Sequence, residues 1–130
     1  MLAHPRQAPL YRSRAIGPRQ PDFINTAIVG ETDLGPRELM AIAKALELAA
    51  GRRAAPRNSP RPLDIDLLLY DEWTNDDPEL LLPHPRLRQR RFALAPLADL
   101  APEWRVPPGG ETVGELLTAL GNEQPVERLA

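Results

Sequence analysis

Proline is the residue that most constrains this chain, which contains 16 of them in 130 residues. A proline fixes its own φ angle and has no backbone N–H to donate, so it interrupts helices and the interiors of sheets. Together with glycine and aspartate, the prolines mark loops at 17–21, 52–61, 76–78 and 107–110. The segments between these loops are long enough for short helices and strands. We expect a single domain spanning residues 1–130.

Hydrophobic periodicity assigns the segments between the loops. Residues 23–32 (FINTAIVGET) and 63–70 (LDIDLLLY) are typical of strands, and 11–16 of a shorter extended piece. A helix is predicted from Pro36 to Gly51, and its apolar stripe consists of Leu39, Ile42, Ala43, Leu46 and Ala50. A second helix is predicted over 112–120, with Thr112 and Glu115 forming a capping box. Residues 1–9 contain two prolines and are expected to make a poor strand.

Composition excludes several classes of protein. The chain has no cysteine and two histidines, which rules out disulfides, thiol nucleophiles and cysteine- or histidine-rich zinc sites. Its net charge of −2 argues against a nucleic-acid-coating role. No apolar run approaches the length of a membrane span, and the N-terminus lacks a signal-peptide core. We therefore expect a cytoplasmic protein that binds neither nucleic acid nor membranes.

Arginine accounts for all but one of the 16 cationic residues, the exception being Lys44. A GC-rich coding bias explains such a composition, and so does a need for guanidinium groups that grip phosphate or carboxylate. The arginines gather in two clusters without acidic residues. The first consists of Arg52, Arg53, Arg57 and Arg61, and the second of Arg86, Arg88, Arg90 and Arg91. This clustering favours a polyanionic ligand.

Asp64 and Asp66 are the strongest chemical feature of the sequence. Side chains alternate along a strand, so these two carboxylates share one face. The opposite face is lined by Leu63, Ile65, Leu67 and Leu69. Such a pair suits Mg²⁺, which takes a few carboxylates together with substrate phosphates. A strand with one solvated face explains a bare Asp-x-Asp equally simply, but here the arginine-containing loop 57–61 leads directly into the pair. Carboxylates and arginines side by side are typical of phosphoryl transfer.

Three further residues are candidates for ligand contacts. His84 lies between two prolines, which hold it rigidly enough for a phosphate contact, although a loop histidine without a role has the same appearance. Phe23 and Asn25 share a strand face, where a ring beside an amide suits a planar heterocycle. Ordinary core packing is the alternative explanation for Phe23.

Taken together, these segments resemble the 6-hydroxymethyl-7,8-dihydropterin pyrophosphokinases of folate biosynthesis. The resemblance runs over about 11–110, and its most specific part is RNSPRPLDIDLL, in which a basic residue, Pro-Arg and Asp-x-Asp follow at the family's spacing. Other matching stretches are QPDFINTAI, LPHPRLRQRRF and APLADLAPEW. The resemblance implies an α+β fold of ferredoxin-like type, an antiparallel sheet with helices packed on it.

The resemblance also implies a role for each matching residue. Asp64 and Asp66 correspond to the ligands of two Mg²⁺ ions, and Arg52 and Arg61 to arginines of a moving catalytic loop. The predicted ATP contacts are Arg57, Leu67, His84 and Arg90. The predicted pterin contacts are Ser13, Arg14, Ile16, Phe23, Asn25 and Phe92. The implied reaction transfers diphosphate from ATP to 6-hydroxymethyl-7,8-dihydropterin and releases AMP, with small molecules as the only partners and a monomer as the full-length form.

The chain also departs from the family pattern. Asn58-Ser59 stands where the family often has Trp-Gly, and a second loop arginine is either Arg53 or absent. The family's first strand, its Gly-Ser-Asn-Leu-Gly motif and its first long helix have no counterpart here. A start codon placed too far downstream and a genuinely short protein both explain this. In either case we expect an empty slot between 23–32 and 63–70 that makes this form less stable and prone to associate.

Three functions remain open at this point. The first is the active diphosphotransferase. The second is a truncated, impaired relative that binds nucleotide or pterin without turnover, and the third is an interaction domain that only shares the fold.

Overall fold

The computed structural model describes residues 2–13, 23–51, 63–121 and 124–129 of the chain. It is a mixed α/β structure in which the strands pair antiparallel. β1 (Ala3–Gln7) pairs with β4 (Ile28–Glu31), and β2 (Tyr11–Ser13) lies between β3 (Phe23–Asn25) and β7 (Val126–Arg128). β5 (Arg105–Val106) and β6 (Glu111–Thr112) form a hairpin. The α+β class expected from the sequence is therefore correct.

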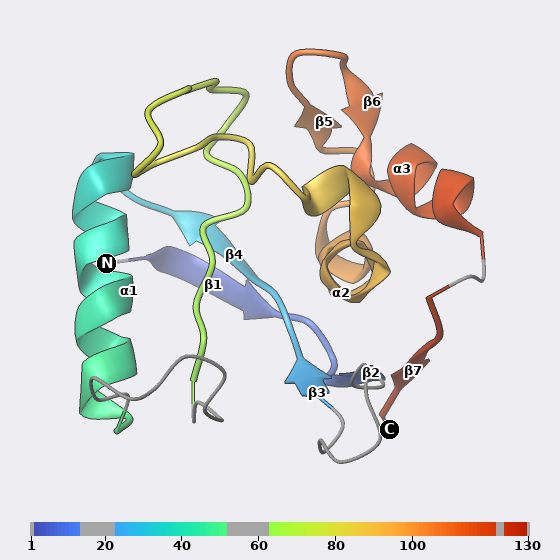
Figure 1. Ribbon diagram of the computed structural model, residues 1–130, viewed down its shortest axis with the longest axis horizontal. Coiled ribbons are helices and arrows are strands. Elements are labelled where there is room, and N and C mark those ends of the chain that lie inside the picture. Colours follow the sequence, from blue (N-terminus) through green and yellow to red (C-terminus); the bar gives the residue numbers. More distant parts are fainter. Residues whose placement is uncertain (1, 14–22, 52–62, 122–123, 130) are drawn as a thin grey trace.

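The helices lie on two sides of this strand layer (Figure 1). α1 (Pro36–Ala49) is separated in the view from α2 (Arg91–Leu100) and α3 (Val113–Leu120) by β1 and β4. A short 3₁₀ turn, η1 (Leu87–Gln89), leads into α2. α2 is the central element, because it packs against α3, η1 and all three strands of the β3-β2-β7 sheet.

The core of the described residues surrounds α2. Its members are Ala8, Ala27, Leu87, Leu94, Leu97, Val106, Val113 and Leu116. Leu87 and Leu94 are completely buried, and truncating a buried leucine to alanine generally costs about 2–5 kcal/mol. This core positions the start of α2, where Arg90 and Phe92 lie.

The predicted strand 23–32 is interrupted. Pro9 has no backbone N–H to donate to the facing strand. At this position the Thr26 hydroxyl donates a hydrogen bond to the Ala8 carbonyl at 2.8 Å. The Ala8 N–H donates to the Ala27 carbonyl at 2.9 Å, which carries the pairing across the break. One expected strand therefore becomes β3 and β4.

The expectation that residues 1–9 make a poor strand was wrong. Ala3–Gln7 forms β1, and the pairing register shifts between Ala3 and Arg6. Pro5 lies within this irregularity, where its missing N–H removes no regular ladder bond. The bulge thus accommodates the proline, and the strand continues to pair with β4.

The expected strand over 63–70 was also wrong. Residues 63–69 have no regular secondary structure. A strand requires an adjacent strand with which its successive residues form backbone hydrogen bonds. In the part of the chain that the structure describes, this segment is held by individual hydrogen bonds instead of a ladder.

The two predicted helices are present. α1 begins with Pro36 and is followed by Gly51 at a φ of 101°, the left-handed conformation expected after a helix end. α3 begins after Thr112, whose hydroxyl accepts from the Glu115 N–H at 3.1 Å while the Glu115 carboxylate accepts from the Thr112 N–H at 3.0 Å. The predicted stripe of α1 is only partly covered, since Leu39 and Ile42 are half-buried and Leu46 is 47% exposed. No helix of the described residues is long and apolar enough to cross a membrane.

Candidate active site

Side-chain exposure alternates over 64–67, because Asp64 and Asp66 are exposed whereas Ile65 and Leu67 are half-buried. Leu63, expected on the apolar face, is instead 38% exposed. Two exposed carboxylates two residues apart supply the hard oxygen ligands that Mg²⁺ prefers, and phosphate and water commonly complete its shell. Among the described residues, no three His, Asp or Glu side chains gather as a metal-binding group.

Two hydrogen bonds hold the backbone around this aspartate pair. The Ile65 N–H donates to the Glu47 carboxylate of α1 at 2.7 Å, and the Leu68 carbonyl accepts from the His84 N–H at 2.9 Å. The second bond brings the proline-flanked histidine alongside the aspartates. Leu68 and His84, 16 positions apart in the sequence, thus become neighbours.

The charged surroundings of His84 show which groups converge. Burial lowers the pKa of His84 below its usual value, and the positive charges of Arg90 and Arg86 lower it further, while nearby Asp66 opposes these effects. The His84 Nδ1 accepts a hydrogen bond from the Arg86 backbone N–H at 3.2 Å. The other ring nitrogen, Nε2, takes no part in this bond. Asp66, His84 and Arg90, three residues predicted from the sequence, are therefore close enough to interact electrostatically.

Arg90 and Phe92 flank the start of α2. The Arg90 guanidinium lies over the Phe92 ring, 5.4 Å from its centre. This cation–π contact links a predicted phosphate contact to a predicted pterin contact. α2 also packs against β3, the strand that carries Phe23, and the Phe23 side chain is 54% exposed. Its exposure contradicts ordinary core packing, the alternative considered for this residue.

Ser13 of β2 and Asn25 of β3 are diagonal neighbours, since Asn25 lies opposite Tyr11 in the register. The Asn25 side-chain amide donates to the Ser13 hydroxyl at 3.0 Å. Ser13 is buried and Asn25 half-buried. An amide has two N–H donors and a carbonyl acceptor, so this bond leaves Asn25 with hydrogen-bonding capacity for a heterocycle edge.

The second arginine cluster divides between two tasks. Arg88 donates to the carbonyls of Val106 and Pro107 at 3.0 and 3.2 Å, so it anchors the β5–β6 hairpin. The backbone N–H of Arg91 at the start of α2 donates to the Gln124 side chain at 3.0 Å. The interpretation of this cluster as a polyanion site therefore loses Arg88, whereas Arg86 and Arg90 lie close enough to His84 to act on its charge.

Five predicted site residues lie outside the described residues: Arg14, Ile16, Arg52, Arg57 and Arg61. Arg53 and the rest of the first arginine cluster lie there too. Their roles stay predictions.

Glu47 is the residue that the sequence analysis missed. It is 7% exposed and contacts the backbone between the two aspartates. A signal was present, because Glu47 follows Ala43 by four residues and precedes Ala50 by three, which places it on the apolar stripe of the helix.

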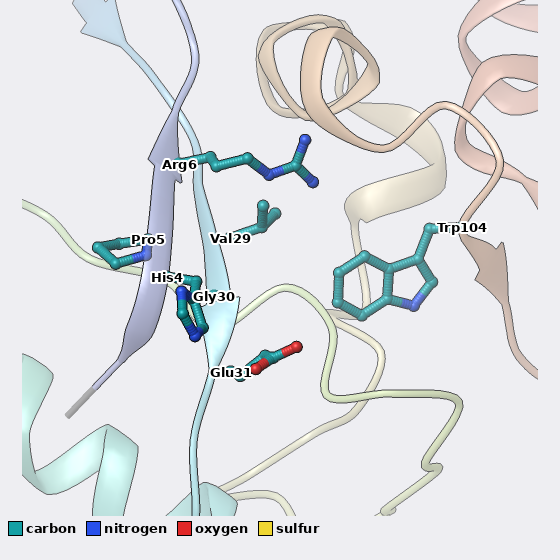
Figure 2. Close-up of a pocket in the computed structure, with 7 residues that line it drawn as sticks. All are labelled: His4, Pro5, Arg6, Val29, Gly30, Glu31 and Trp104. Carbon is teal, nitrogen blue, oxygen red and sulfur yellow. The ribbon is translucent and has the colours of Figure 1, made fainter.

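A cavity of about 470 Å³ lies elsewhere, between the β1–β4 pair and Trp104 (Figure 2). Figure 2 shows the Trp104 ring and the Arg6 and Val29 side chains facing this space from opposite sides. The Trp104 ring is oriented by its N–H, which donates to the Asp71 carbonyl at 2.9 Å. Of the predicted site residues that the structure describes, none lines this cavity, so the candidate site is placed around Asp66 and His84.

Comparison with known proteins identifies the family of the chain. Residues 2–102 match the family model described as 7,8-dihydro-6-hydroxymethylpterin-pyrophosphokinase. The chain is 44% identical over 123 residues to a 2-amino-4-hydroxy-6-hydroxymethyldihydropteridine pyrophosphokinase of Pseudomonas aeruginosa, covering 94% of this chain and 75% of that protein.

Two further relatives show how the matched lengths vary. A protein of the same name from Synechocystis is 41% identical over 107 residues, which are 82% of this chain. The mitochondrial folate synthesis bifunctional protein of Arabidopsis thaliana is 47% identical over 81 residues, 62% of this chain and 15% of that protein. The chain spans 55% of the length of the Synechocystis protein. By the extent of the family match and the identity to the Pseudomonas protein, the chain belongs to the 7,8-dihydro-6-hydroxymethylpterin-pyrophosphokinase family.

Proposed function

We propose that this protein is a Mg²⁺-dependent diphosphotransferase that converts ATP and 6-hydroxymethyl-7,8-dihydropterin into AMP and the pterin diphosphate. The observation that carries the proposal is the convergence of Asp66, His84 and Arg90, because a carboxylate beside cationic and imidazole groups suits a metal-bound polyphosphate. Membership of the family and the printed names of the relatives support the same reaction.

The reaction forms a bond between the hydroxymethyl oxygen of the pterin and the β-phosphorus of ATP. The bond from that phosphorus to the oxygen it shares with the α-phosphate breaks, AMP leaves, and the hydroxyl proton is released. When bound at Asp64 and Asp66, two Mg²⁺ ions would supply neutralisation of the phosphate charge.

The remaining contacts with the two substrates are assigned to residues of this chain. Arg90 and His84 bind the triphosphate, and Leu67 lies beside the nucleotide. Phe23 and Phe92 enclose the pterin ring, while Asn25 and Ser13 bind its edge. Arg52, Arg57 and Arg61 belong to the same proposed site through the family motif, together with Arg14 and Ile16 on the pterin side. The proposed architecture is ferredoxin-like, the proposed location is the cytoplasm, and the reactants are the proposed partners of a monomer.

Product analysis tests this function directly. The purified protein is incubated with Mg²⁺, ATP and the dihydropterin, and the nucleotides and pterins are separated chromatographically. Equal amounts of AMP and pterin diphosphate are expected, and both should disappear when the pterin is omitted or Mg²⁺ is chelated. ADP as the product contradicts diphosphate transfer. Binding of both substrates without AMP identifies the impaired, binding-only relative.

A further inference from the structure

α1 buries a carboxylate in preference to its leucines. Among the described residues of this 14-residue helix, Glu47 is the buried one, at 7% exposure. Its neighbours Leu46 and Leu48 are 47% and 65% exposed. Burying an ionisable carboxylate is costly unless hydrogen bonds compensate it, so this arrangement requires a specific partner.

Among the described residues, one partner is the backbone between the two predicted metal ligands. The Glu47 Oε2 accepts from the Ile65 N–H at 2.7 Å, a length typical of a charge-assisted hydrogen bond. From these contacts we propose that Glu47 is a positioning residue, which orients Asp64 and Asp66 for the metal–nucleotide complex without touching it. This inference rests on the proposed function for the identity of the ligand.

Backbone geometry explains how one hydrogen bond can act on both aspartates. The peptide unit joining Asp64 to Ile65 is planar, so an acceptor at the Ile65 N–H fixes the orientation of the whole unit. Asp64 lies on one side of this unit, and Asp66 follows directly after Ile65. Because residues 63–69 belong to no strand ladder, individual bonds of this kind determine where the carboxylates point.

α1 has two other attachments to the following segment, and they provide a matched control. Arg37 pairs with Asp77, and the Tyr70 hydroxyl donates to the Leu34 carbonyl at 2.5 Å, just before the helix. Arg37 lies near the beginning of α1 and Glu47 near its end. Removing the Arg37 pair therefore weakens the docking of the helix without touching the aspartates.

The test compares Glu47→Ala, Glu47→Gln and Arg37→Met in the full chain. Binding of Mn²⁺ with a non-hydrolysable ATP analogue is measured by paramagnetic resonance, and pterin binding by calorimetry. Loss of a group that orients a metal ligand typically weakens metal affinity about 10–100-fold. We expect that loss in Glu47→Ala, with pterin affinity within about twofold of the wild type. Glu47→Gln retains an acceptor oxygen and should recover most of the affinity, and Arg37→Met should bind Mn²⁺ as the wild type does.

The outcomes separate positioning from general stability and from the reaction itself. Unchanged Mn²⁺ affinity in a folded Glu47→Ala overturns the proposal, as does an equal loss in Arg37→Met. If Glu47→Ala does not fold, the comparison is made between Glu47→Gln and Glu47→Asp. The aspartate side chain is shorter and reaches the Ile65 N–H less well, so the proposal requires Glu47→Asp to bind Mn²⁺ more weakly than Glu47→Gln does. Failure of the wild type to release AMP refutes the proposed function, whereas selective loss of Mn²⁺ binding in Glu47→Ala still supports positioning.

Discussion

At the scale of single residues, the candidate site brings charged side chains close together. Holding them there costs free energy unless a ligand binds them. Burial lowers the pKa of His84 below its usual value, Asp66 opposes this effect, and Arg90 and Arg86 lower the pKa further. A histidine with two arginines nearby suits the negative charge of a polyphosphate. The aspartates then supply the counter-charge for a metal.

Replacing either aspartate tests the metal assignment. Asp64→Asn and Asp66→Asn keep the size of the side chain but remove an anionic oxygen ligand. We expect each to reduce kcat at least about 100-fold, the size of loss seen when a preorganised electrostatic group is removed. Steady-state AMP release over a range of Mg²⁺ concentrations is the measurement. Near-native activity in both variants would falsify the assignment.

Replacing Phe92 tests the division between pterin and nucleotide binding. Offset stacking on a ring contributes about 0.5–1.5 kcal/mol beyond area burial, so Phe92→Ala should weaken pterin binding about tenfold or less. Nucleotide binding should fall by a smaller factor, because only the cation–π contact with Arg90 is lost. Calorimetric titration with each ligand measures both effects.

Phe92→Leu is the control for packing, since it keeps an apolar side chain without a ring. It should resemble Phe92→Ala in pterin affinity and the wild type in thermal stability. Equal losses for pterin and nucleotide would instead point to a collapsed core around α2.

At the scale of elements, α3 shows how a short helix is started by two side chains. Thr112 and Glu115 each satisfy the other's backbone N–H, and Gly121 follows the helix with a positive φ of 62°. The hydrogen bonds from Thr112 lower the pKa of Glu115, and Arg105 lowers it further. The helix start is therefore sensitive to acid.

Thr112→Ala should lower the free energy of unfolding by about 1 kcal/mol, the usual effect of losing an N-cap side chain. Chemical denaturation monitored by circular dichroism measures it. Thr112→Ser keeps the hydroxyl and should match the wild type. An unchanged unfolding free energy in Thr112→Ala would mean that the cap contributes nothing.

The pH dependence of this cap has a definite sign. Because the folded pKa of Glu115 lies below the unfolded value, its contribution is present above the ordinary glutamate pKa of about 4.3. It is lost as the pH falls through the folded pKa. Asp77 has a lowered pKa as well, so the wild type is compared with Glu115→Gln. The difference in their unfolding free energies should shrink as acid is added, and a constant difference would contradict this linkage.

At the scale of the whole molecule, the last strand of the described chain returns to β2 near the beginning of the sequence. β7 pairs with β2, and Arg128 forms an ion pair with Asp99 at 2.5 Å while its Nε donates to the Tyr11 hydroxyl at 3.1 Å. The Tyr11 hydroxyl also donates to Asp99, and burial together with this carboxylate raises the pKa of Tyr11. Residues 11, 99 and 128 thus connect β2, α2 and β7.

A double-mutant cycle measures this connection. Tyr11→Phe removes the hydroxyl and Arg128→Met removes the charge while keeping an apolar stem. Contacting residues in one network commonly show non-additive effects, and we expect a measurable coupling between these two that the exposure of Arg128 reduces. Additive effects of the two substitutions in chemical denaturation would show that the network does not act as a unit.

Local chemistry was enough to predict much of this protein from its sequence. The start of α1 at Pro36 and the capping box of α3 depend on interactions within a few residues, and the structure confirms them. The arginine and aspartate motif also identified the family, because its spacing is contained in one short segment.

Only the tertiary structure decided which distant groups meet. Whether 63–70 forms a strand depends on neighbouring backbone that its own residues do not specify, so a correct pattern of side chains gave a wrong element. The burial of Glu47 against Ile65, the use of Arg88 to anchor a hairpin and the approach of His84 to Asp66 join residues far apart in sequence. Periodicity reports which face of a segment is apolar, but the partner that satisfies a buried carboxylate or an unpaired N–H is set by how the whole chain packs.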